Sequence, residues 1–318
     1  MNLRQISLDV IDLKDERFRF SYHFDLDRLL LSVKEIGLVN PPVIVNQESR
    51  FILVTGWKRL FTCLELSLTP LPVFILEQDD DFQAFLFSLY ENLTHRDFDL
   101  LEKAEILRLL KGFIKDEKQL VKDYLPLLGI PATLPYLDLY VKISQLESRW
   151  KKVIYEKKMS LASVELLTEF DVLERELLLP LILPLSQNKQ KQILNDLIQI
   201  SRKEEISLKK ILAAQKIQPV LQSERLTPLQ KAEKIRILLR KERYPSLSAW
   251  KESFDASLKR ACLSKEVTVE SSSFFENGEF SVSFSLRDKE EFSKRLAKLE
   301  KLISDEALIS LFKRLPDG

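Results

Sequence analysis

The stretch LVTGWKRLFTCLELSLTPLPVFILEQDDDFQAFLFSLYENLTHRDFDLLEKA, residues 53–104, alternates apolar runs with two polar clusters. The first cluster is Gly56-Trp57-Lys58-Arg59, and the second is Glu91-Asn92-Leu93-Thr94-His95-Arg96. Apolar residues at helical spacing follow the first cluster and precede the second, whereas residues 71–76 form a short apolar run typical of a strand. The pattern predicts a small domain of mixed strands and helices, with the two clusters at the ends of elements.

Outward from this stretch, the same alternation covers the first hundred residues. A helix is predicted over Asp27 to Ile36 with Gly37 as its stop, and strands are predicted over Val43 to Val45 and Phe51 to Val54. After Gly56 a helix is predicted again, and Asp79 to Asp81 start the helix that leads to the second cluster. This order of elements indicates an α+β domain.

Composition bounds the class of protein. The chain has 318 residues, 45% of them hydrophobic and 31% charged, which suits two or three globular domains. No apolar run of about 18 residues predicts a membrane span, and the first residues show no secretory signal, so a cytoplasmic protein without membrane attachment is expected. Cys63 and Cys262 lie far apart and are predicted to be reduced thiols. With two histidines, His23 and His95, the chain has almost no material for histidine zinc sites or Ser-His-Asp chemistry.

Charge is unevenly distributed along the chain. Residues 1–110 contain 12 Lys and Arg against 18 Asp and Glu, whereas the remainder contains 37 against 30. The excess of positive charge in residues 111–318 is consistent with binding to a polyanion, and equally with a basic surface that is only solvated.

Four motifs in residues 5–110 resemble the N-terminal domain of the ParB family, which has the ParB/sulfiredoxin fold. They are the turn from Gly37 to Val43, the loop from Gly56 to Thr62, Leu71-Pro72-Val73, and Glu91 to Phe98 followed by Leu101-Glu102-Lys103-Ala104. The resemblance implies a site for CTP and Mg²⁺, with Glu91 and Asn92 near the metal and the turn at Gly37 to Pro41 against the base. The nucleotide-binding residues expected from it are Gly37, Asn40, Pro41, Gly56, Lys58, Arg59, Glu91, Asn92, His95 and Arg96.

Physical chemistry supports an anion site at the first cluster. Gly56 allows close approach of the backbone, the helix that follows presents unpaired N–H groups, and Lys58 and Arg59 add positive charge. A second interpretation makes Gly56 a turn glycine, leaves Lys58 and Arg59 solvated, and has Glu91 and Asn92 cap a helix. Trp57 is then a packed or partner-facing aromatic, although base stacking is open in this loop.

The chain departs from the family pattern at both clusters. Trp57 and Lys58 stand where the family has glutamate and arginine, so a point charge replaces a bidentate guanidinium. His95 occupies the position of the motif arginine, and Arg96, shifted by one, would turn about 100° away on a helix. Sulfiredoxin activity is excluded because Trp57 stands at the position of its reactive cysteine, and hydrolysis of CTP is left undecided.

A helix is predicted over Leu101 to Lys115, and the region after it resembles a helix-turn-helix, with Lys122 to Pro131 as first helix and turn and Ala132 to Ile143 in place of the recognition helix. That second helix offers Pro135, Tyr136, Asp138 and Tyr140, which are poor base readers. The next segment is basic, and the residues expected to contact DNA with low sequence specificity are Arg149, Lys151, Lys152, Lys157 and Lys158. Alternatively, this segment is a solvated helix whose Trp150, Val153 and Ile154 pack inward.

The predicted domains are a ParB/sulfiredoxin-like nucleotide-binding domain at 1–100, a helical, degenerate helix-turn-helix-like domain at 101–218, and a C-terminal α+β module at 219–318. Residues 219–228 are predicted as a linker and Gln230 to Arg243 as a helix that Pro245 ends, with another helix over Leu247 to Ala261. Strict alternation over Val267 to Glu270 and Glu279 to Phe284, around the turn Glu276 to Glu279, predicts a hairpin. A helix from Lys289 to Leu302, capped by Asp288, completes a ββα module that packs on preceding helices or forms a homodimer.

Two classes of function follow from these expectations. The first is a ParB-like protein that associates with DNA, responds to CTP and acts in DNA segregation or nucleoid organisation. The second is a degenerate relative that serves as a protein-interaction scaffold without nucleotide binding, with Trp57 as a contact. A nuclease or kinase on the same fold has no dense carboxylate cluster in the sequence to support it.

Overall fold

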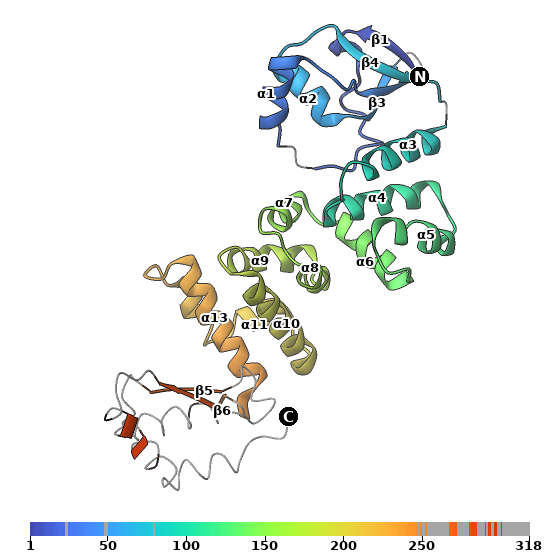
Figure 1. Cartoon of the computed structure of the whole chain (residues 1–318). Helices are drawn as coiled ribbons and strands as arrows, with labels where there is room; N and C mark the ends of the chain where they lie inside the picture. Colours follow the sequence, from blue (N-terminus) through green and yellow to red (C-terminus); the bar gives the residue numbers. More distant parts are fainter. Residues whose placement is uncertain are drawn as a thin grey trace. The chain divides into compact units, whose positions relative to one another are not determined.

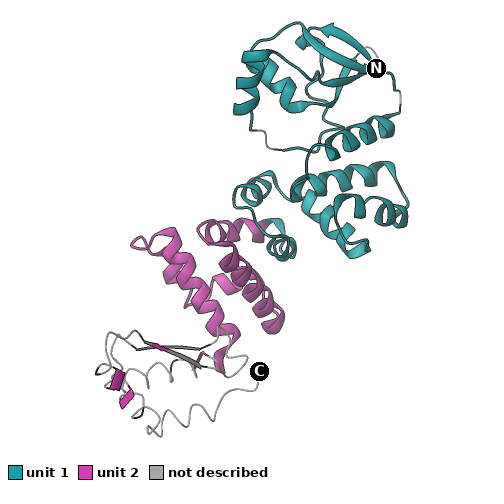
Figure 2. Cartoon of the chain, viewed as in Figure 1, with its two compact units in different colours: residues 1–172 teal, residues 173–318 magenta. Residues whose placement is uncertain are grey.

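The computed structural model describes residues 1–22, 25–47, 50–78, 80–246, 248–249, 252, 267–271, 280–284, 290, 292–293, 296–297 and 300. The chain divides into two compact units, Met1–Val172 and Leu173–Gly318, which Figure 2 colours separately. The domain boundaries expected at residues 100 and 218 stay predictions.

A four-stranded mixed sheet forms the start of unit 1, in the order β1-β4-β2-β3. The outer pairs, β1 with β4 and β2 with β3, are antiparallel, whereas the central pair β2 and β4 is parallel. The strands are β1 Asn2–Ile6, β2 Val43–Gln47, β3 Arg50–Thr55 and β4 Leu71–Leu76. The three strands predicted from apolar runs are therefore confirmed, and β1 is an additional strand that the sequence patterns did not predict.

Three helices accompany the sheet in unit 1, namely α1 Asp27–Ile36, α2 Trp57–Glu65 and α3 Asp81–Leu93 (Figure 1). Gly37 ends α1 at φ 76°, in the left-handed region that glycine adopts without strain. Asp80 caps α3 by accepting a hydrogen bond from the Phe82 N–H. The predicted starts of the three helices and the predicted stop of α1 at Gly37 are confirmed.

An apolar core holds α2 against the sheet. Ile44 and Leu53 contribute to it from the strands, and Leu60 and Cys63 from the inner face of α2, all four fully buried. Trp57 also belongs to this core, at the first residue of α2. Because α2 is fixed by this packing, its N-terminus is held in a defined place at the end of β3.

The rest of unit 1 is helical. Its first helix begins with a capping box in which Asp99 accepts hydrogen bonds from the backbone N–H groups of Leu101 and Glu102. The elements are α4 Leu100–Phe113, α5 Glu117–Asp123, the short 3-10 helix Pro126–Leu128, α6 Leu134–Ser144, α7 Ser148–Glu156 and α8 Leu161–Thr168. Helices are present where the helix-turn-helix was expected, and Gly129 makes a left-handed turn between them at φ 67°.

Unit 2 contains a helical layer and a two-stranded sheet. Its helices are α9 Val172–Ile182, α10 Gln187–Glu204, α11 Leu208–Leu212, α12 Gln218–Gln222 and α13 Pro228–Arg243. The predicted linker at 219–228 therefore starts inside a helix, α12. Strands β5 Val267–Ser271 and β6 Phe280–Phe284 pair antiparallel, as their alternation predicted.

Several C-terminal predictions fall outside the described residues. They are the hairpin turn Glu276 to Glu279, most of the helix Leu247 to Ala261, the cap Asp288 and the thiol of Cys262; His23 in unit 1 is likewise outside them. In the part of the chain that the structure describes, no helix combines the length and apolar character needed to cross a membrane.

Candidate functional site

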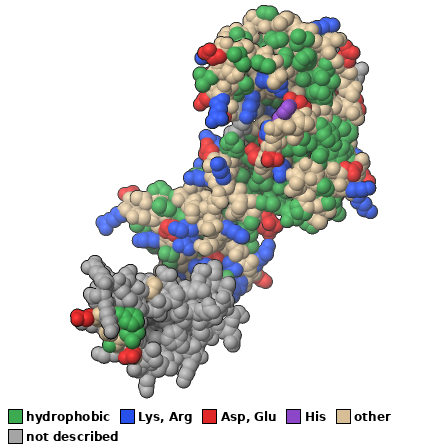
Figure 3. Space-filling model, viewed as in Figure 1, with side chains coloured by type: hydrophobic (Ala, Val, Ile, Leu, Met, Phe, Trp, Pro, Cys, Tyr) green, Lys and Arg blue, Asp and Glu red, His purple; other side chains and the backbone are tan. Residues whose placement is uncertain are grey.

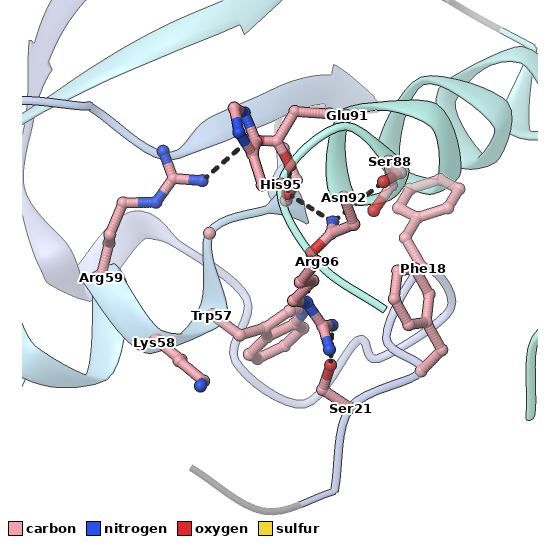
Figure 4. A pocket seen from close by; sticks show the side chains of 13 residues that line it. Phe18, Ser21, Trp57, Lys58, Arg59, Ser88, Glu91, Asn92, His95 and Arg96 are labelled. Carbon is pink, nitrogen blue, oxygen red and sulfur yellow. Dashed lines mark hydrogen bonds and ion pairs between the residues drawn. The ribbon is translucent and has the colours of Figure 1, made fainter. Parts of the chain in front are cut away.

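A cavity of about 210 Å³ lies in unit 1 where the first turn of α2 faces the end of α3. The segment before α1 closes its third side (Figure 4). In the space-filling view, Lys and Arg side chains gather beside a hollow in this part of the surface (Figure 3). The lining residues are Phe18, Phe20, Ser21, Thr55, Gly56, Trp57, Lys58, Arg59, Ser88, Glu91, Asn92, His95 and Arg96.

The cavity brings together seven of the ten residues predicted to bind nucleotide, namely Gly56, Lys58, Arg59, Glu91, Asn92, His95 and Arg96. The other three, Gly37, Asn40 and Pro41, do not line it. The two polar clusters quoted from the sequence thus meet in one cavity, although 35 residues separate Gly56 from Glu91.

Gly56 is required by the geometry of the loop. Its φ is 102°, and a Cβ at this position would lie 2.8 Å from Cβ of Pro42 and 3.2 Å from Nε of Arg59. Any side chain would therefore push apart the turn at Pro42 and the first turn of α2. Gly56 also makes no side-chain capping bond, so the N–H groups that open α2 remain available to an anion.

Arg59 joins three segments of the site. Its Nη1 donates to the carbonyl oxygens of Asn40 and Pro41, each at 3.2 Å, and its Nη2 lies 3.3 Å from Oε1 of Glu91. Glu91 in turn accepts a hydrogen bond from Oγ1 of Thr55 at 2.9 Å. Arg59 therefore ties the turn before β2, which the resemblance places against the base, to the end of α3.

Asn92 is oriented by its neighbours on α3 and β3. Its Nδ2 donates to the backbone carbonyl of Ser88 at 2.9 Å and to Oγ1 of Thr55 at 3.3 Å. Its Oδ1 accepts from Nε of Arg96 at 3.2 Å. The amide of Asn92 is thus fixed in one orientation, with its oxygen toward the arginine.

The expectation that Arg96 turns away from the site because of a one-residue shift on a helix was wrong. Helix α3 ends at Leu93, and the backbone N–H of Arg96 still donates to the carbonyl oxygen of Asn92 at 3.2 Å. The Arg96 side chain lines the cavity (Figure 4). Nη1 of Arg96 contacts both carboxylate oxygens of Glu102, at 2.8 and 2.7 Å, and Nη2 donates to Oγ of Ser21 at 2.9 Å.

Tyr22, next to Ser21, connects this side of the cavity to α4 and α7. Its hydroxyl donates to Oε2 of Glu105 at 2.5 Å and accepts from Nζ of Lys151 at 3.2 Å. Burial and the bond to the Glu105 carboxylate raise the pKa of Tyr22. Burial lowers the pKa of Lys151, although the charge of Glu105 opposes this shift.

Trp57 is buried, which contradicts its suggested role as an exposed contact for a protein partner. Its indole belongs to the core beneath α2, and the Arg19 guanidinium lies over its ring at 5.0 Å from the centroid. The neighbouring side chains of Lys58 and His95 are exposed. Lys58 therefore offers an exposed positive charge beside the cavity.

The five predicted DNA-contacting residues belong to α7 and the turn after it. Arg149, Lys152, Lys157 and Lys158 are exposed, whereas Lys151 is half-buried against Tyr22 and supports the structure. Trp150, Val153 and Ile154 pack inward, as the alternative interpretation of this segment expected. Helix α7 therefore has a buried apolar face and an exposed basic face, so the two interpretations of this segment are compatible.

Helix α6 does not present a base-reading surface. Leu134, Pro135 and Asp138 are exposed near its N-terminus, and Lys142 is its exposed positive residue. Since base edges are read by Arg, Lys, Asn and Gln, this surface supports little sequence-specific readout.

The residues present fit a phosphate group at the cavity. The open N-terminus of α2 and the Lys58 side chain supply donors and positive charge, and the volume is below that of a typical cavity for a whole cofactor. Phosphates therefore fit the enclosed part, and the remainder of a nucleotide would extend beyond it. For Mg²⁺, Glu91 is the carboxylate at hand; the described residues contain no cluster of three or more metal-ligating side chains, and Mg²⁺ bound through phosphates needs only one or two carboxylates.

Sequence reasoning missed the third side of the cavity, which includes Phe18, Phe20 and Ser21, and also Thr55 and Ser88. A segment without hydrophobic periodicity gives no sequence pattern from which its hydroxyl groups and aromatic rings could be predicted to line a cavity. Glu102 was predicted only as part of the motif that follows the second cluster. Its hydrogen bond with Ser21 was not predicted, because the two residues are 81 positions apart in the sequence.

Comparison with known proteins gives three curated relatives, each described as a probable chromosome-partitioning protein ParB. The one from Borreliella burgdorferi is 24% identical over 158 residues, 49% of this chain and 58% of the relative. Those from Campylobacter jejuni and Helicobacter pylori are each 22% identical, over 55% and 48% of this chain and 62% and 51% of the relatives. The matches thus cover less than two thirds of each relative's length, and no family model matches the chain.

Two solved structures of the C-terminally truncated chromosome-partitioning protein ParB from Caulobacter crescentus are similar to this chain. One is complexed with CTP-γ-S (15% identity, TM-score 0.28, 54% of this chain and 93% of that chain). The other is complexed with the centromeric parS site (13% identity, TM-score 0.34, 60% of this chain and 98% of that chain). Through its ordered motifs and these curated relatives, the chain is similar to ParB proteins over about half of its length, as a divergent relative.

Proposed function

We propose that this chain associates with DNA, binds CTP in the cavity of unit 1, and acts in DNA segregation or nucleoid organisation. The observation that carries the proposal is the meeting of both polar clusters at the uncapped N-terminus of α2. The chromosome-partitioning description of the curated relatives supports the biological role. Hydrolysis of CTP is not part of the proposal.

In this proposal each part of the cavity has a separate task. The N–H groups of α2 and the Lys58 ammonium hold phosphate oxygens, Glu91 and Asn92 supply oxygen atoms for Mg²⁺, and Arg59 orders the turn from Gly37 to Pro41 against the base. His95 and Arg96 complete the wall near the end of α3. The roles of Glu91, Asn92 and the turn from Gly37 to Pro41 follow the resemblance, whereas those of Lys58 and Arg59 rest on charge and on the hydrogen bonds of Arg59.

DNA contact is assigned to the exposed basic residues at α7 and to phosphates rather than bases, because α6 lacks base-reading side chains. Fluorescence anisotropy with labelled duplexes tests this assignment. Affinity should fall steeply between about 50 and 200 mM salt and should differ little between sequences. Addition of Mg²⁺ and CTP should change that affinity; no DNA binding at the lower salt concentration would refute the proposal.

The second candidate is a ParB-fold interaction scaffold without nucleotide binding. It is favoured by the engagement of both cavity arginines with internal carboxylates, Arg59 with Glu91 and Arg96 with Glu102. Such a scaffold would bind neither CTP nor DNA. A partner contact at Trp57 is no longer part of it, since the side chain is buried.

A further inference from the structure

The indole N–H of Trp57 has no hydrogen-bond acceptor among the described residues, although its nitrogen is buried. Trp57 is 6% exposed, stands first in α2 and lines the cavity. In native proteins nearly every buried N–H is paired, and an exception calls for a water, an ion or a ligand. This donor therefore requires an acceptor that the described side chains and backbone do not supply.

The groups left unengaged at this end of the cavity are donors. Gly56 leaves the first N–H groups of α2 uncapped, and Lys58 forms no ion pair with the residues that the structure describes. Glu91, the acidic side chain of the cavity lining, is already engaged, because its Oε1 faces Arg59 and its Oε2 accepts from Thr55. A set of free donors with a net positive charge is complementary to a ligand that offers several acceptors and negative charge, such as a phosphate.

Packing accounts for the ring of Trp57 but not for its nitrogen. The indole fills the core beneath α2 and lies under the Arg19 guanidinium. Phenylalanine would also provide an apolar ring there and would bury no unpaired donor. Trp150 has a buried, unpartnered indole nitrogen as well, but it lies in α7 and does not line the cavity. The position at the cavity is what distinguishes Trp57.

We propose that the indole N–H of Trp57 donates a hydrogen bond to a phosphate oxygen of a ligand bound at the N-terminus of α2. This inference rests on the proposed function and adds a specific donor to it. Trp57 and Lys58 would together hold the anion, while Arg59 and Arg96 shape the walls through their internal acceptors.

Calorimetric titration of the full chain tests the proposal with two probes, Mg²⁺–CTP and inorganic pyrophosphate. Trp57→Phe should weaken both by about tenfold, the effect of losing one hydrogen bond to a charged group. Trp150→Phe is the matched control, since it removes a second unpartnered indole, which belongs to α7 and does not line the cavity, and it should leave both affinities unchanged. Circular dichroism confirms that each variant is folded.

Three outcomes would overturn the proposal in distinguishable ways. Equal binding by wild type and folded Trp57→Phe would show that the indole is core packing only. A loss with Mg²⁺–CTP but not with pyrophosphate would place the contact away from phosphate. Absence of binding by the wild type would remove both this inference and the proposed function.

A second measurement on the unaltered chain does not depend on the folding of Trp57→Phe. The three tryptophans give three indole signals in a ¹H–¹⁵N correlation spectrum, of which Trp150→Phe assigns one and Trp250→Phe another. Addition of pyrophosphate should move the Trp57 indole proton downfield and leave the Trp150 signal in place. A Trp57 signal that is unchanged at saturating pyrophosphate would contradict the proposed hydrogen bond.

Discussion

The guanidinium of Arg96 donates from Nη1 to both carboxylate oxygens of Glu102, at 2.8 and 2.7 Å, and this pair joins the cavity to the first turn of α4. The Glu102 side chain is 8% exposed and that of Arg96 is 33% exposed. Because the carboxylate is buried, loss of its partner leaves an uncompensated charge.

Arg96→Ala should lower the free energy of unfolding by about 2 kcal/mol, less than the value for a fully buried pair because the guanidinium is one-third exposed. Urea denaturation measures the change. Arg50→Ala is the control, since Arg50 is 71% exposed and lies 3.9 Å from Asp12; it should cost less than about 0.5 kcal/mol. Equal losses of unfolding free energy in Arg96→Ala and Arg50→Ala would show that the Arg96–Glu102 pair contributes no more stability than an exposed ion pair.

Gly56→Ala should destabilise the protein by more than about 1 kcal/mol, because a Cβ would lie 2.8 Å from Pro42 and φ is 102°. It should also abolish nucleotide binding, since the first turn of α2 must move. Gly112→Ala, in α4 with no atom within 4 Å of the added Cβ, should instead stabilise by about 0.5–1 kcal/mol. Thermal unfolding of both variants compares the two sites, and a neutral Gly56→Ala would refute the close packing at Pro42.

Tyr22 predicts a pH dependence of stability. The pKa of Tyr22 is raised above 10.0 in the folded protein. Its contribution to the free energy of unfolding is therefore complete below pH 10.0 and is lost as pH rises through the pKa of the folded state. Lys151 acts in the opposite direction, because its lowered pKa makes the folded state gain stability as pH rises toward 10.5.

Tyr22→Phe should cost about 1.5 kcal/mol near neutral pH, the worth of a hydrogen bond to a charged group. The difference between wild type and Tyr22→Phe should shrink above pH 10. Denaturation by urea at pH 8 and pH 10.5 measures it. A difference that stays constant over this range would contradict the bond between Tyr22 and Glu105.

DNA binding should depend on the exposed basic residues at α7. Each phosphate contact contributes about 0.9 to the slope of log affinity against log salt. The double variant Lys152→Ala/Lys157→Ala should therefore reduce that slope by about 1.8 on every duplex tested. Lys191→Ala, which removes an exposed lysine of α10, serves as the control; a slope unchanged by the double variant would remove α7 from the interface.

How much could be predicted from sequence differs between the fold and the site. Helix α1 and strands β2, β3 and β4 follow local apolar patterns, so their positions were predicted. Strand β1 was not, because four of its five residues are exposed and it has no apolar face to reveal it.

Within the site, residues in motifs were predicted and residues in irregular segments were not. Ser21 and Tyr22 lie in a segment without periodicity, and their partners Glu102 and Glu105 are 81 and 83 residues away. The Arg96 side chain is held by Asn92, Glu102 and Ser21, and the last of these partners is 75 residues away in the sequence.

Calorimetric titration with the four Mg²⁺-nucleoside triphosphates, repeated with Arg59→Ala, tests the central claim most directly. The wild type should bind CTP selectively, and Arg59→Ala should lose at least about tenfold in affinity, because Arg59 orders Asn40, Pro41 and Glu91. Arg28→Ala, an exposed arginine of α1, should bind as the wild type does. Failure of the folded protein to bind any nucleotide, or equal binding by Arg59→Ala, would contradict the assigned site.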